Sequence, residues 1–250
     1  MAPRGLNLSN ETESFFRWLL IPSDKILSIP QADYDFNAIR FRNLVIFGSM
    51  GSGKSELTRS MLEKVVEFYG EENVNGVYTD TGRIGWMLKY GLDERLVQFL
   101  LCDDLTLCPI SKEELREWFK IRHRWKRLTG RNTGYVISVL TCHRLFGVPI
   151  ELRTNADCII VRNDTLNPYD HSILRRFIGK EGIEDLNEIE LKREEDPSHM
   201  SYSIYNNRFS KGILNIPMAK VNYLKELGVP ISVVYENVLK SPRSIARARL

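Results

Sequence analysis

Eight consecutive residues carry the clearest chemical pattern in this sequence of 250 residues. They match G-x-x-x-x-G-K-[ST], a pattern in which backbone amides and a lysine surround phosphate oxygens. Glycine suits this task because it adopts positive φ and has no Cβ to keep the backbone away from a ligand. The matching residues are Gly48, Ser49, Met50, Gly51, Ser52, Gly53, Lys54 and Ser55, and we include the next residue, Glu56, in the expected binding segment.

The surroundings of this octapeptide favour the same chemistry. We expect an apolar strand over 44–47, directly before it, and an amphipathic helix over 55–69, directly after its lysine. The N-terminus of a helix presents free N–H groups to an anion. The segment is therefore predicted to bind ATP, with Lys54 at the β and γ phosphates and Ser55 as a ligand of Mg²⁺. The alternative is a glycine-rich turn that does no more than precede a helix.

Two adjacent carboxylates, Asp103 and Asp104, follow the apolar strand expected over 97–102. A carboxylate at the end of a buried strand can hold Mg²⁺, and a second one can orient or deprotonate an attacking water. We assign Asp103 to the metal and Asp104 to the water. The alternative for Asp104 is a cap on the turn that follows it.

A further polar group stands at the end of the strand expected over 135–140, which continues into Thr141, Cys142, His143 and Arg144. If this strand lies between the strand of the phosphate loop and the strand of the acids, its tip is close to the γ-phosphate. We therefore expect His143 to sense that phosphate.

The remaining pattern alternates short apolar segments with helical ones. Such alternation is typical of an α/β fold with a mainly parallel sheet that helices cover on both faces. A capping box at Asn10 and Glu13 begins a helix that ends near Leu20. The expected strands are 44–47, 74–79, 97–102, 135–140 and 158–161, and the longer helices are 55–69 and 111–128.

The composition is that of an ordinary globular chain. Apolar residues make up 43% and charged residues 27%, and the net charge is +3. No apolar run reaches the ~18–20 residues that a membrane-spanning helix needs. Residues 1–16 carry no secretory signal, so we expect the protein in the cytoplasm. The four cysteines form no C-x-x-C pair, which favours free buried thiols over a zinc site.

Charge is concentrated in three segments. Residues 112–131 contain eight Lys or Arg against three Glu, residues 181–196 contain eight acids against two bases, and residues 240–250 contain four bases. Within the first segment, basic residues recur at intervals of three or four, the spacing of one helix face. This face is a candidate surface for duplex phosphates, and the alternative is a solvated charged face. Its candidate contacts are Arg116, Lys120, Arg124 and Arg127.

The segment 136–162 resembles the FtsK/HerA superfamily of P-loop ATPases. The resemblance rests on the strand tip, on Pro149, on the run Arg153-Thr154-Asn155-Ala156-Asp157 and on the strand that follows it. His143 stands where that superfamily usually has Gln. The resemblance is greatest to small viral and plasmid members, including genome-packaging ATPases. It implies a RecA-like (ASCE) P-loop NTPase fold and a homo-oligomeric ring, often a hexamer, that pumps double-stranded DNA.

The same resemblance implies an arginine that completes the ATP site of a neighbouring subunit. Arg153 is the first candidate for this role, and Arg144 and Arg162 are the others. The predicted function is an ATP-hydrolysing DNA motor in packaging, transfer or replicon maintenance. A DnaA-like or helicase-loader ATP switch and a P-loop small-molecule kinase are the alternatives.

We expect three parts along the chain. Residues 1–40 form an N-terminal helix and lead-in, 41–215 form the ATPase domain, and 216–250 form a basic C-terminal segment. In the last part, three short helices are predicted over 219–227, 231–239 and 242–249. They are compatible with a helix-turn-helix that contacts DNA, and equally with a basic tail.

Overall fold

A single mixed sheet organises the computed structural model, which describes residues 10–21, 38–79, 84–105, 110–162, 168–195, 200–205 and 212–227. Within these residues the strand order is β7-β6-β5-β1-β4-β3-β2-β8. The six consecutive strands β5, β1, β4, β3, β2 and β8 are parallel, whereas β6 pairs antiparallel with both β5 and β7. The strands are β1 (Ala38–Phe47), β2 (Val74–Thr79), β3 (Val97–Cys102), β4 (Thr133–Cys142), β5 (Cys158–Val161), β6 (Met200–Tyr205), β7 (Gly212–Asn215) and β8 (Lys225–Glu226).

The strand order brings the predicted site residues to one edge. β4 lies between β1 and β3, with Phe47 opposite Cys142 and Cys102 opposite Leu140. The phosphate loop, the acids and the tip of β4 therefore meet at the carboxyl ends of three neighbouring strands. This order confirms the predicted α/β class, with the RecA-like insertion of β4.

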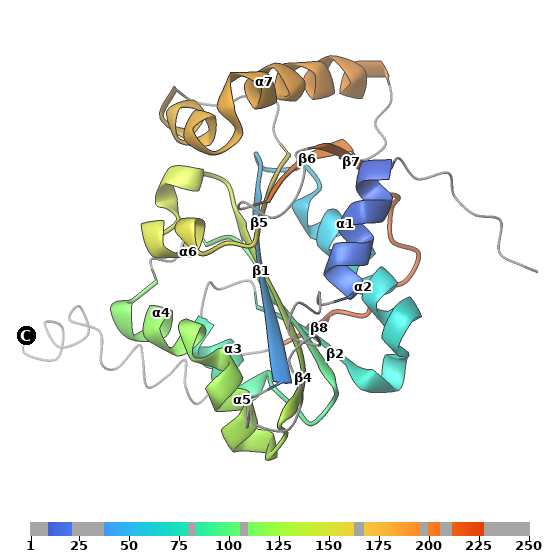
Figure 1. Ribbon diagram of the computed structural model, residues 1–250, viewed down its shortest axis with the longest axis vertical. Helices are drawn as coiled ribbons and strands as arrows, with labels where there is room; N and C mark the ends of the chain where they lie inside the picture. The colour runs from blue at the N-terminus through green and yellow to red at the C-terminus, as the bar shows by residue number, and fades with distance from the viewer. Residues whose placement is uncertain are drawn as a thin grey trace, which may run out of the picture.

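Helices cover both faces of the sheet, and α7 lies at one end of the molecule (Figure 1). The α-helices are α1 (Asn10–Leu20), α2 (Lys54–Tyr69), α3 (Ile84–Tyr90), α4 (Lys112–Phe119), α5 (Ile121–Thr129), α6 (Ile150–Thr154) and α7 (Pro168–Glu195). The 3₁₀ turns are η1 (Glu71–Asn73) and η2 (Leu145–Gly147). No helix in the described ranges has the length and apolar character that crossing a membrane requires.

Two hydrophobic cores result from the alternation of side chains along each strand. Leu44 and Ile46 of β1 pack with α1 and α2, whereas Val45 and Phe47 pack with helices α3 to α7. Each fully buried large apolar side chain contributes about 1.5–3 kcal/mol. Strands buried on both faces read as continuous apolar runs, which is why β1 and β3 were visible in the sequence. The described cysteines, Cys102, Cys142 and Cys158, are buried and form no disulfide.

The helix predicted over 111–128 is two helices. The predicted capping box is present, since Ser111 accepts from Glu114 N–H, but helix α4 ends at Phe119 and α5 begins at Ile121. Lys120 departs from helical geometry at φ −98° and ψ 9°, and its N–H bonds to Glu117 O in a tightened last turn. This break turns the chain so that Trp118, Ile121 and Trp125 all enter the core.

The prediction of a helix over 219–227 is wrong. Residues 225 and 226 form β8, which pairs with Val77 and Tyr78 of β2. Upstream, the N–H groups of residues 219–221 donate to the carboxylates of Glu56 and Glu63 on α2. These long-range partners replace the local hydrogen bonds of a helix. The helices predicted over 231–239 and 242–249 lie outside the described residues, and the three-part division of the chain remains a prediction.

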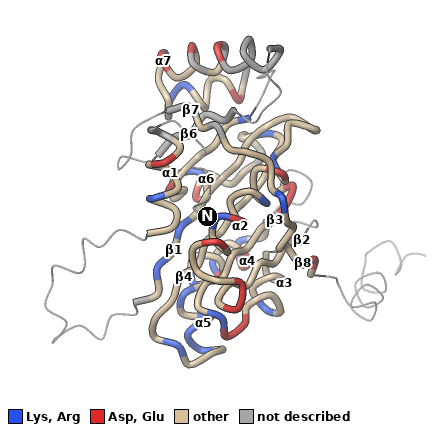
Figure 2. The backbone as a smooth tube through the Cα atoms, turned by 90° about the vertical axis from the view of Figure 1, so that its right-hand side faces the viewer, with Lys and Arg blue, Asp and Glu red and all other residues tan. Residues whose placement is uncertain are grey.

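The charged segments lie far apart. Figure 2 shows basic residues on α5 at one end of the molecule and acidic residues on α7 at the other. β4 connects the α5 end to the nucleotide site, because it begins beside the end of α5 and ends at the phosphate loop. Ten strand residues at ~3.3 Å each span about 33 Å.

Candidate nucleotide-binding site

The phosphate loop joins β1 to α2 through two glycines in the left-handed region. Gly51 has φ 75° and Gly53 has φ 83°, and the latter caps the N-terminus of α2. Gly48 is required for space, because a Cβ there would lie 1.8 Å from Arg162 O and 2.5 Å from Ser52 Oγ. The loop therefore takes the shape that its glycines predicted, with the N–H groups of α2 at its mouth.

Lys54 is buried at the base of this loop, with 6% of its surface exposed. Its Nζ donates to Gly48 O and Ser49 O, both at 2.9 Å, and lies 3.1 Å from His143 Nδ1. Burial lowers the pKa of the Lys54 ammonium, and the nearby Asp103 carboxylate acts in the opposite direction. No carboxylate of the described residues forms an ion pair with it, so its charge is available to a phosphate.

Asp103 joins the loop to β4. One carboxylate oxygen accepts from Ser55 Oγ at 3.3 Å, and the other accepts from Thr141 Oγ1. Its N–H donates to Thr79 O at 2.9 Å, which fixes the turn at the end of β3. The two residues predicted as metal ligands, Ser55 and Asp103, are therefore adjacent.

These two residues fit Mg²⁺. A hydroxyl and a carboxylate are the oxygen donors that Mg²⁺ prefers, and Mg²⁺ commonly takes one or two protein ligands together with phosphate and water. The described residues contain no group of three or more His, Cys, Asp or Glu that could hold a metal alone. The pair thus fits a metal that arrives with a nucleotide.

Asp104 has the features of a reactive group under constraint. It is the one non-glycine residue with positive φ among the described residues, at 53°. Its N–H donates to Thr141 Oγ1 at 3.0 Å, and its Oδ2 lies 3.3 Å from His143 Nε2. Its Oδ1 is buried and has no hydrogen-bond partner among the described residues. One oxygen of this carboxylate is therefore unpaired within the part of the chain that the structure describes.

His143 connects Asp104 to Lys54. An ammonium has only donors, so the Nδ1 atom that faces Lys54 must be the acceptor. In that tautomer, Nε2–H faces Asp104 Oδ2 at 3.3 Å and can donate to it. An Nδ1 acceptor with an Nε2–H donor suits both Lys54 and Asp104, and the same Nδ1 also lies 3.3 Å from Gly48 O.

The three candidate arginines occupy different places. The Arg162 guanidinium packs over Gly53 of its own loop, where Nη1 lies 3.4 Å from the position of a built Cβ. Arg144 is exposed and forms no ion pair with any described residue. Arg153 lines a pocket between α6 and α7, and its Nε is buried without a hydrogen-bond partner. Glu56 binds Arg59 and Ala219 N–H rather than facing the loop.

Two contributions were missed in the sequence. Thr141 bridges Asp103 and the backbone of Asp104, and Arg162 lies over the loop. The one available signal was that Thr141 is a polar residue at the end of an apolar strand. Its role depends on the insertion of β4 between β1 and β3, which residue spacing does not encode.

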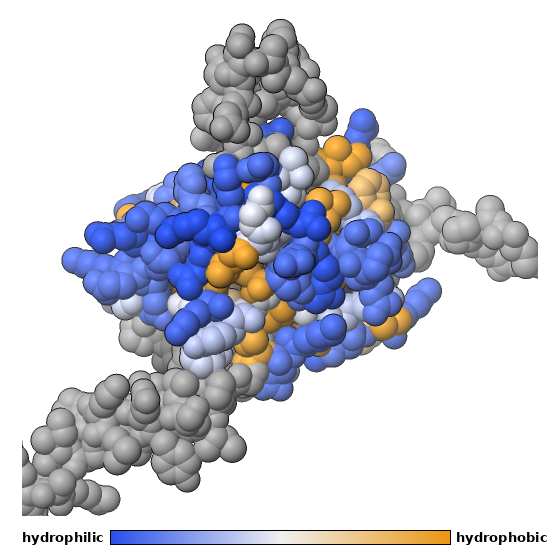
Figure 3. All heavy atoms as spheres, turned by 90° about the horizontal axis from the view of Figure 1, so that it is seen from below, coloured by the Kyte–Doolittle hydropathy of each residue, from blue (hydrophilic) through white to orange (hydrophobic). Residues whose placement is uncertain are grey.

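Only part of the predicted basic face is exposed and unpaired within the described residues. Arg116, Lys120 and Arg127 are exposed, but Arg124 donates to Glu117 at 2.8 Å. At the start of β4, Gly134 allows the ring of Trp125 to pack on the strand, since a Cβ would lie 2.1 Å from that ring. Viewed from the α5 end, the surface is largely hydrophilic with a narrow hydrophobic strip (Figure 3).

The fold and this site define a P-loop NTPase with the RecA-like strand order. Similar solved structures include the genome packaging NTPase B204 from Sulfolobus turreted icosahedral virus 2 in complex with ATP-gammaS. It is 14% identical over 71% of this chain and 98% of that chain, with a TM-score of 0.48. Another is the cytoplasmic domain of the Thermomonospora curvata Type VII secretion ATPase EccC, 13% identical over 75% of this chain and 25% of that chain, with a TM-score of 0.42.

A third similar structure is the pCW3 conjugation coupling protein TcpA, 9% identical over 74% of this chain and 62% of that chain, with a TM-score of 0.40. All three are P-loop ATPases of the FtsK/HerA type, the type that residues 136–162 resemble. No protein-family model matches the chain, and no curated protein does. At these identities the likeness is one of fold, and the function rests on the residues of the site.

Proposed function

We propose that this protein is an ATP-hydrolysing DNA motor that works in the cytoplasm. The observation that carries the hydrolytic part is the half-paired Asp104 carboxylate, which Thr141 and His143 hold beside Lys54. A group that only caps a turn does not need a strained backbone and an unpartnered buried oxygen.

In this proposal, ATP binding exchanges the partners of Lys54. The ammonium leaves Gly48 O and Ser49 O for the β and γ phosphates, which offer charge instead of neutral carbonyls. Ser55 and Asp103 would hold Mg²⁺, which neutralises charge that develops on the phosphates. The amides at the start of α2 bind the remaining phosphate oxygens.

Hydrolysis then depends on Asp104. Its Oδ1 accepts a hydrogen bond from a water in line with the γ-phosphate, while His143 holds Oδ2 through Nε2–H. The water oxygen bonds to the γ-phosphorus, its proton passes to Asp104, and the bond to the ADP oxygen breaks. His143 detects the phosphate indirectly, because departure of Lys54 releases its Nδ1.

An arginine from a neighbouring copy in a ring would complete the site. Among the three candidates, Arg144 is favoured because it is exposed at the tip of β4, next to His143. Arg162 lies over its own loop, and Arg153 lies in a pocket. In mixed assemblies, Arg144→Ala and Lys54→Ala subunits should together recover part of the ATPase activity that each lacks. If Arg153→Ala gives the recovery and Arg144→Ala does not, the arginine is Arg153.

Contact with duplex DNA is assigned to the exposed basic residues of α4 and α5. The segment 112–131 has eight bases and three acids, a net charge of +5. A surface that tracks phosphates loses affinity with salt, at a slope of ~0.9 per contact on a log–log scale. The double variant Arg116→Gln/Arg127→Gln should flatten this slope by about 1.8, whereas Arg124→Gln should have less effect because Glu117 already pairs with it.

The test of the whole proposal is ATP hydrolysis with and without duplex DNA, followed by displacement of a protein roadblock from that DNA. A motor hydrolyses ATP faster on DNA and removes the roadblock. Binding without displacement would indicate an ATP switch. Transfer of phosphate to a small acceptor, with no response to DNA, would indicate a kinase.

A further inference from the structure

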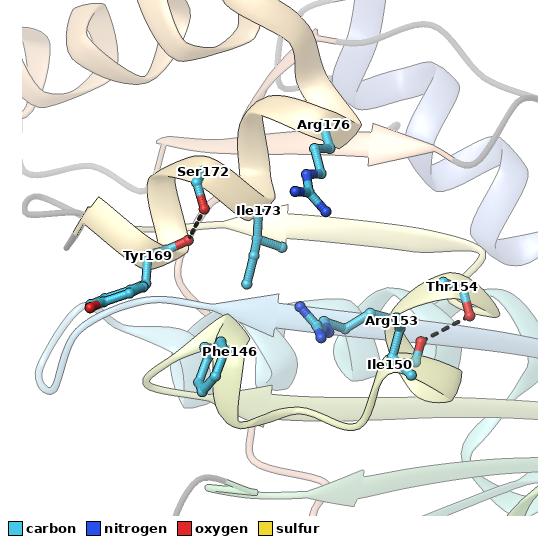
Figure 4. Close-up of a pocket in the computed structure, with 8 residues that line it drawn as sticks. All are labelled: Phe146, Ile150, Arg153, Thr154, Tyr169, Ser172, Ile173 and Arg176. Carbon is cyan, nitrogen blue, oxygen red and sulfur yellow. Dashed lines mark hydrogen bonds between the residues drawn. The ribbon is translucent and has the colours of Figure 1, made fainter.

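A second concave site lies between α6 and α7. It has a volume of about 450 Å³ and is open on one side. Figure 4 shows side chains from η2, α6 and α7 around it. The residues that matter here are Phe146, Ile150, Arg153, Tyr169, Ile173 and Arg176.

Two arginines give this pocket a positive charge. The guanidinium groups of Arg153 and Arg176 both extend into the space between the two helices (Figure 4). Neither forms an ion pair with a carboxylate of the described residues, and Arg153 Nε is buried without a partner. A buried guanidinium nitrogen without an acceptor favours an incoming anion.

The rest of the pocket is apolar and exposed. Phe146, Ile150 and Tyr169 expose 67%, 61% and 74% of their surface, and the two rings lie 6.4 Å apart. Grouped apolar side chains on a surface mark interaction sites, and aromatic residues beside arginine are typical of protein-binding hot spots.

The hydroxyl groups of the pocket decide between ligand classes. Thr154 Oγ1 donates to Ile150 O and Ser172 Oγ donates to Tyr169 O, each at 2.8 Å. Their protons are therefore used within their own helices, which leaves the two guanidinium groups and the Tyr169 hydroxyl as side-chain donors of the lining. A nucleobase, whose edge has acceptors and donors to be matched, would find little to bind. A ligand with a carboxylate next to an apolar side chain would find the arginines for the carboxylate and the exposed apolar residues for the side chain.

The backbone behind the pocket is held by contacts within the fold. Phe146 N–H donates to Asp170 Oδ1 at 2.9 Å, and Asp170 is 1% exposed. Leu145 and Leu152 pack in the same core as Leu174. A preformed pocket requires little reorganisation on binding.

We propose that this pocket binds a peptide segment of a partner protein, one in which an Asp or Glu stands next to a large apolar residue. The carboxylate binds Arg153 and Arg176, and the apolar side chain packs on Phe146, Ile150 and Tyr169. This surface is separate from the phosphate loop, so the proposal does not depend on ATP hydrolysis.

The test uses fluorescein-labelled eight-residue peptides that pair Glu with Phe, Trp or Leu, titrated with nucleotide-free protein and followed by anisotropy. At least one should bind, and its Gln counterpart should bind about ten-fold more weakly, the loss expected for a charged hydrogen bond. Arg176→Gln should cause a similar loss. Arg175→Gln, on the next residue of α7 and outside the pocket, is the matched control and should bind normally.

Three results would overturn the proposal. The first is no binding of any peptide at about 1 mM to folded wild-type protein, the weak limit of a specific site. The second is displacement of the peptide by a mononucleotide in Lys54→Ala protein, which would make the pocket a nucleotide site. The third is a change of oligomeric state in Arg176→Gln on sedimentation, which would make the occupant a second copy of the chain.

Discussion

Two polar clusters lie at opposite edges of the same sheet and differ in how completely they are hydrogen-bonded. At the amino ends of β2 and β3, Arg95 donates to Asp93, to Val74 O and to Asn75 Oδ1 at 2.6–2.8 Å. Gln98 bonds to Asn75 and to Asp93. At the carboxyl ends, Asp104 Oδ1 and Ser52 Oγ are buried without partners among the described residues.

The difference separates a structural cluster from a binding one. A saturated network stabilises the fold, since each buried partner has its bond, and it leaves no atom for a ligand. An unpaired buried oxygen costs free energy in the empty protein and recovers it when a ligand binds. Substitutions at the carboxyl ends of the strands should therefore affect activity, and substitutions at the amino ends should affect stability.

The largest effect is expected for Lys54→Ala. ATP turnover should fall by at least about 10³-fold, because the variant lacks the cation at the base of the loop. The melting temperature should change little, since removal of a buried ammonium without an ion pair offsets the loss of its hydrogen bonds to Gly48 O and Ser49 O. Single-turnover hydrolysis and calorimetry on the same preparation measure both. Substantial residual turnover would show that another cation serves the phosphates.

Asp104→Asn should reduce hydrolysis by about 10²–10⁴-fold and leave ATP binding intact, since it removes the proton acceptor but keeps the size of the side chain. Fluorescent-nucleotide titration and phosphate release separate these two properties. Asp93→Asn, an equal change at the opposite edge, is the control and should hydrolyse normally. Normal hydrolysis by Asp104→Asn would remove this residue from the role of base.

His143→Leu should lower the rate of hydrolysis by about ten-fold, the effect of losing a hydrogen bond that orients a base. His143→Gln should retain most of the rate, because an amide can donate to Asp104 and accept from Lys54. Steady-state ATPase rates of the two variants distinguish the effect of the hydrogen bonds from the effect of the imidazole ring. Equal rates for Leu and Gln would mean that His143 does not position Asp104.

Arg95→Ala should lower the free energy of unfolding by about 1–3 kcal/mol, since it leaves Val74 O, Asn75 and Asp93 without their donor. The ion pair of Arg95 with Asp93 is partly exposed, with 29% of the Arg95 side chain and 39% of the Asp93 side chain accessible. This exposure favours the lower part of that range. Urea unfolding measures it, and Arg59→Ala in an exposed pair is the control. The rate of ATP hydrolysis per folded molecule should not change.

The smallest expected effect is a pH dependence of the folding stability, which arises from Asp93 at the amino ends of β2 and β3. Burial raises the pKa of Asp93, but the hydrogen bonds from Arg95 and Gln98 outweigh it, and the pKa lies below its usual value. A lowered folded-state pKa gives stability above the unfolded pKa of ~3.9 and loses it as pH falls through the folded value. The stability advantage of wild type over Asp93→Asn should thus shrink between pH 5 and acid pH, by about 1 kcal/mol or less after solvent screening.

Local patterns predicted some elements to the residue and missed others. β2, β3 and β5 have their predicted bounds, and each ends directly before a charged residue. β1 extends back to Ala38, into a stretch that looks polar, because Arg42 is buried with its guanidinium 4.8 Å above the Trp18 ring. That contact joins α1 to the sheet, and a single-strand pattern does not contain it.

The site divides in the same way. The loop, Asp103 and Asp104 follow from residue type and spacing, since each motif is contiguous in the chain. The role of Thr141 and the position of Arg162 depend on which strands are neighbours. The roles of Asp104, His143 and the arginines in catalysis, and of α4 and α5 with DNA, remain predictions.

In the proposed motor, the length of β4 sets a scale for movement. Its two ends, one beside the basic helix and one at His143, are about 33 Å apart, and both are held by packing rather than by loops. A stiff connection of this length turns small angles into useful displacements. A rigid-body rotation of ~15° about the nucleotide end would move the basic end by roughly 8 Å, in the range of subunit rotations in other switching proteins. If the proposed DNA motor uses such a rotation, at 3.4 Å per base pair along one strand it would move about two base pairs of duplex for each ATP hydrolysed.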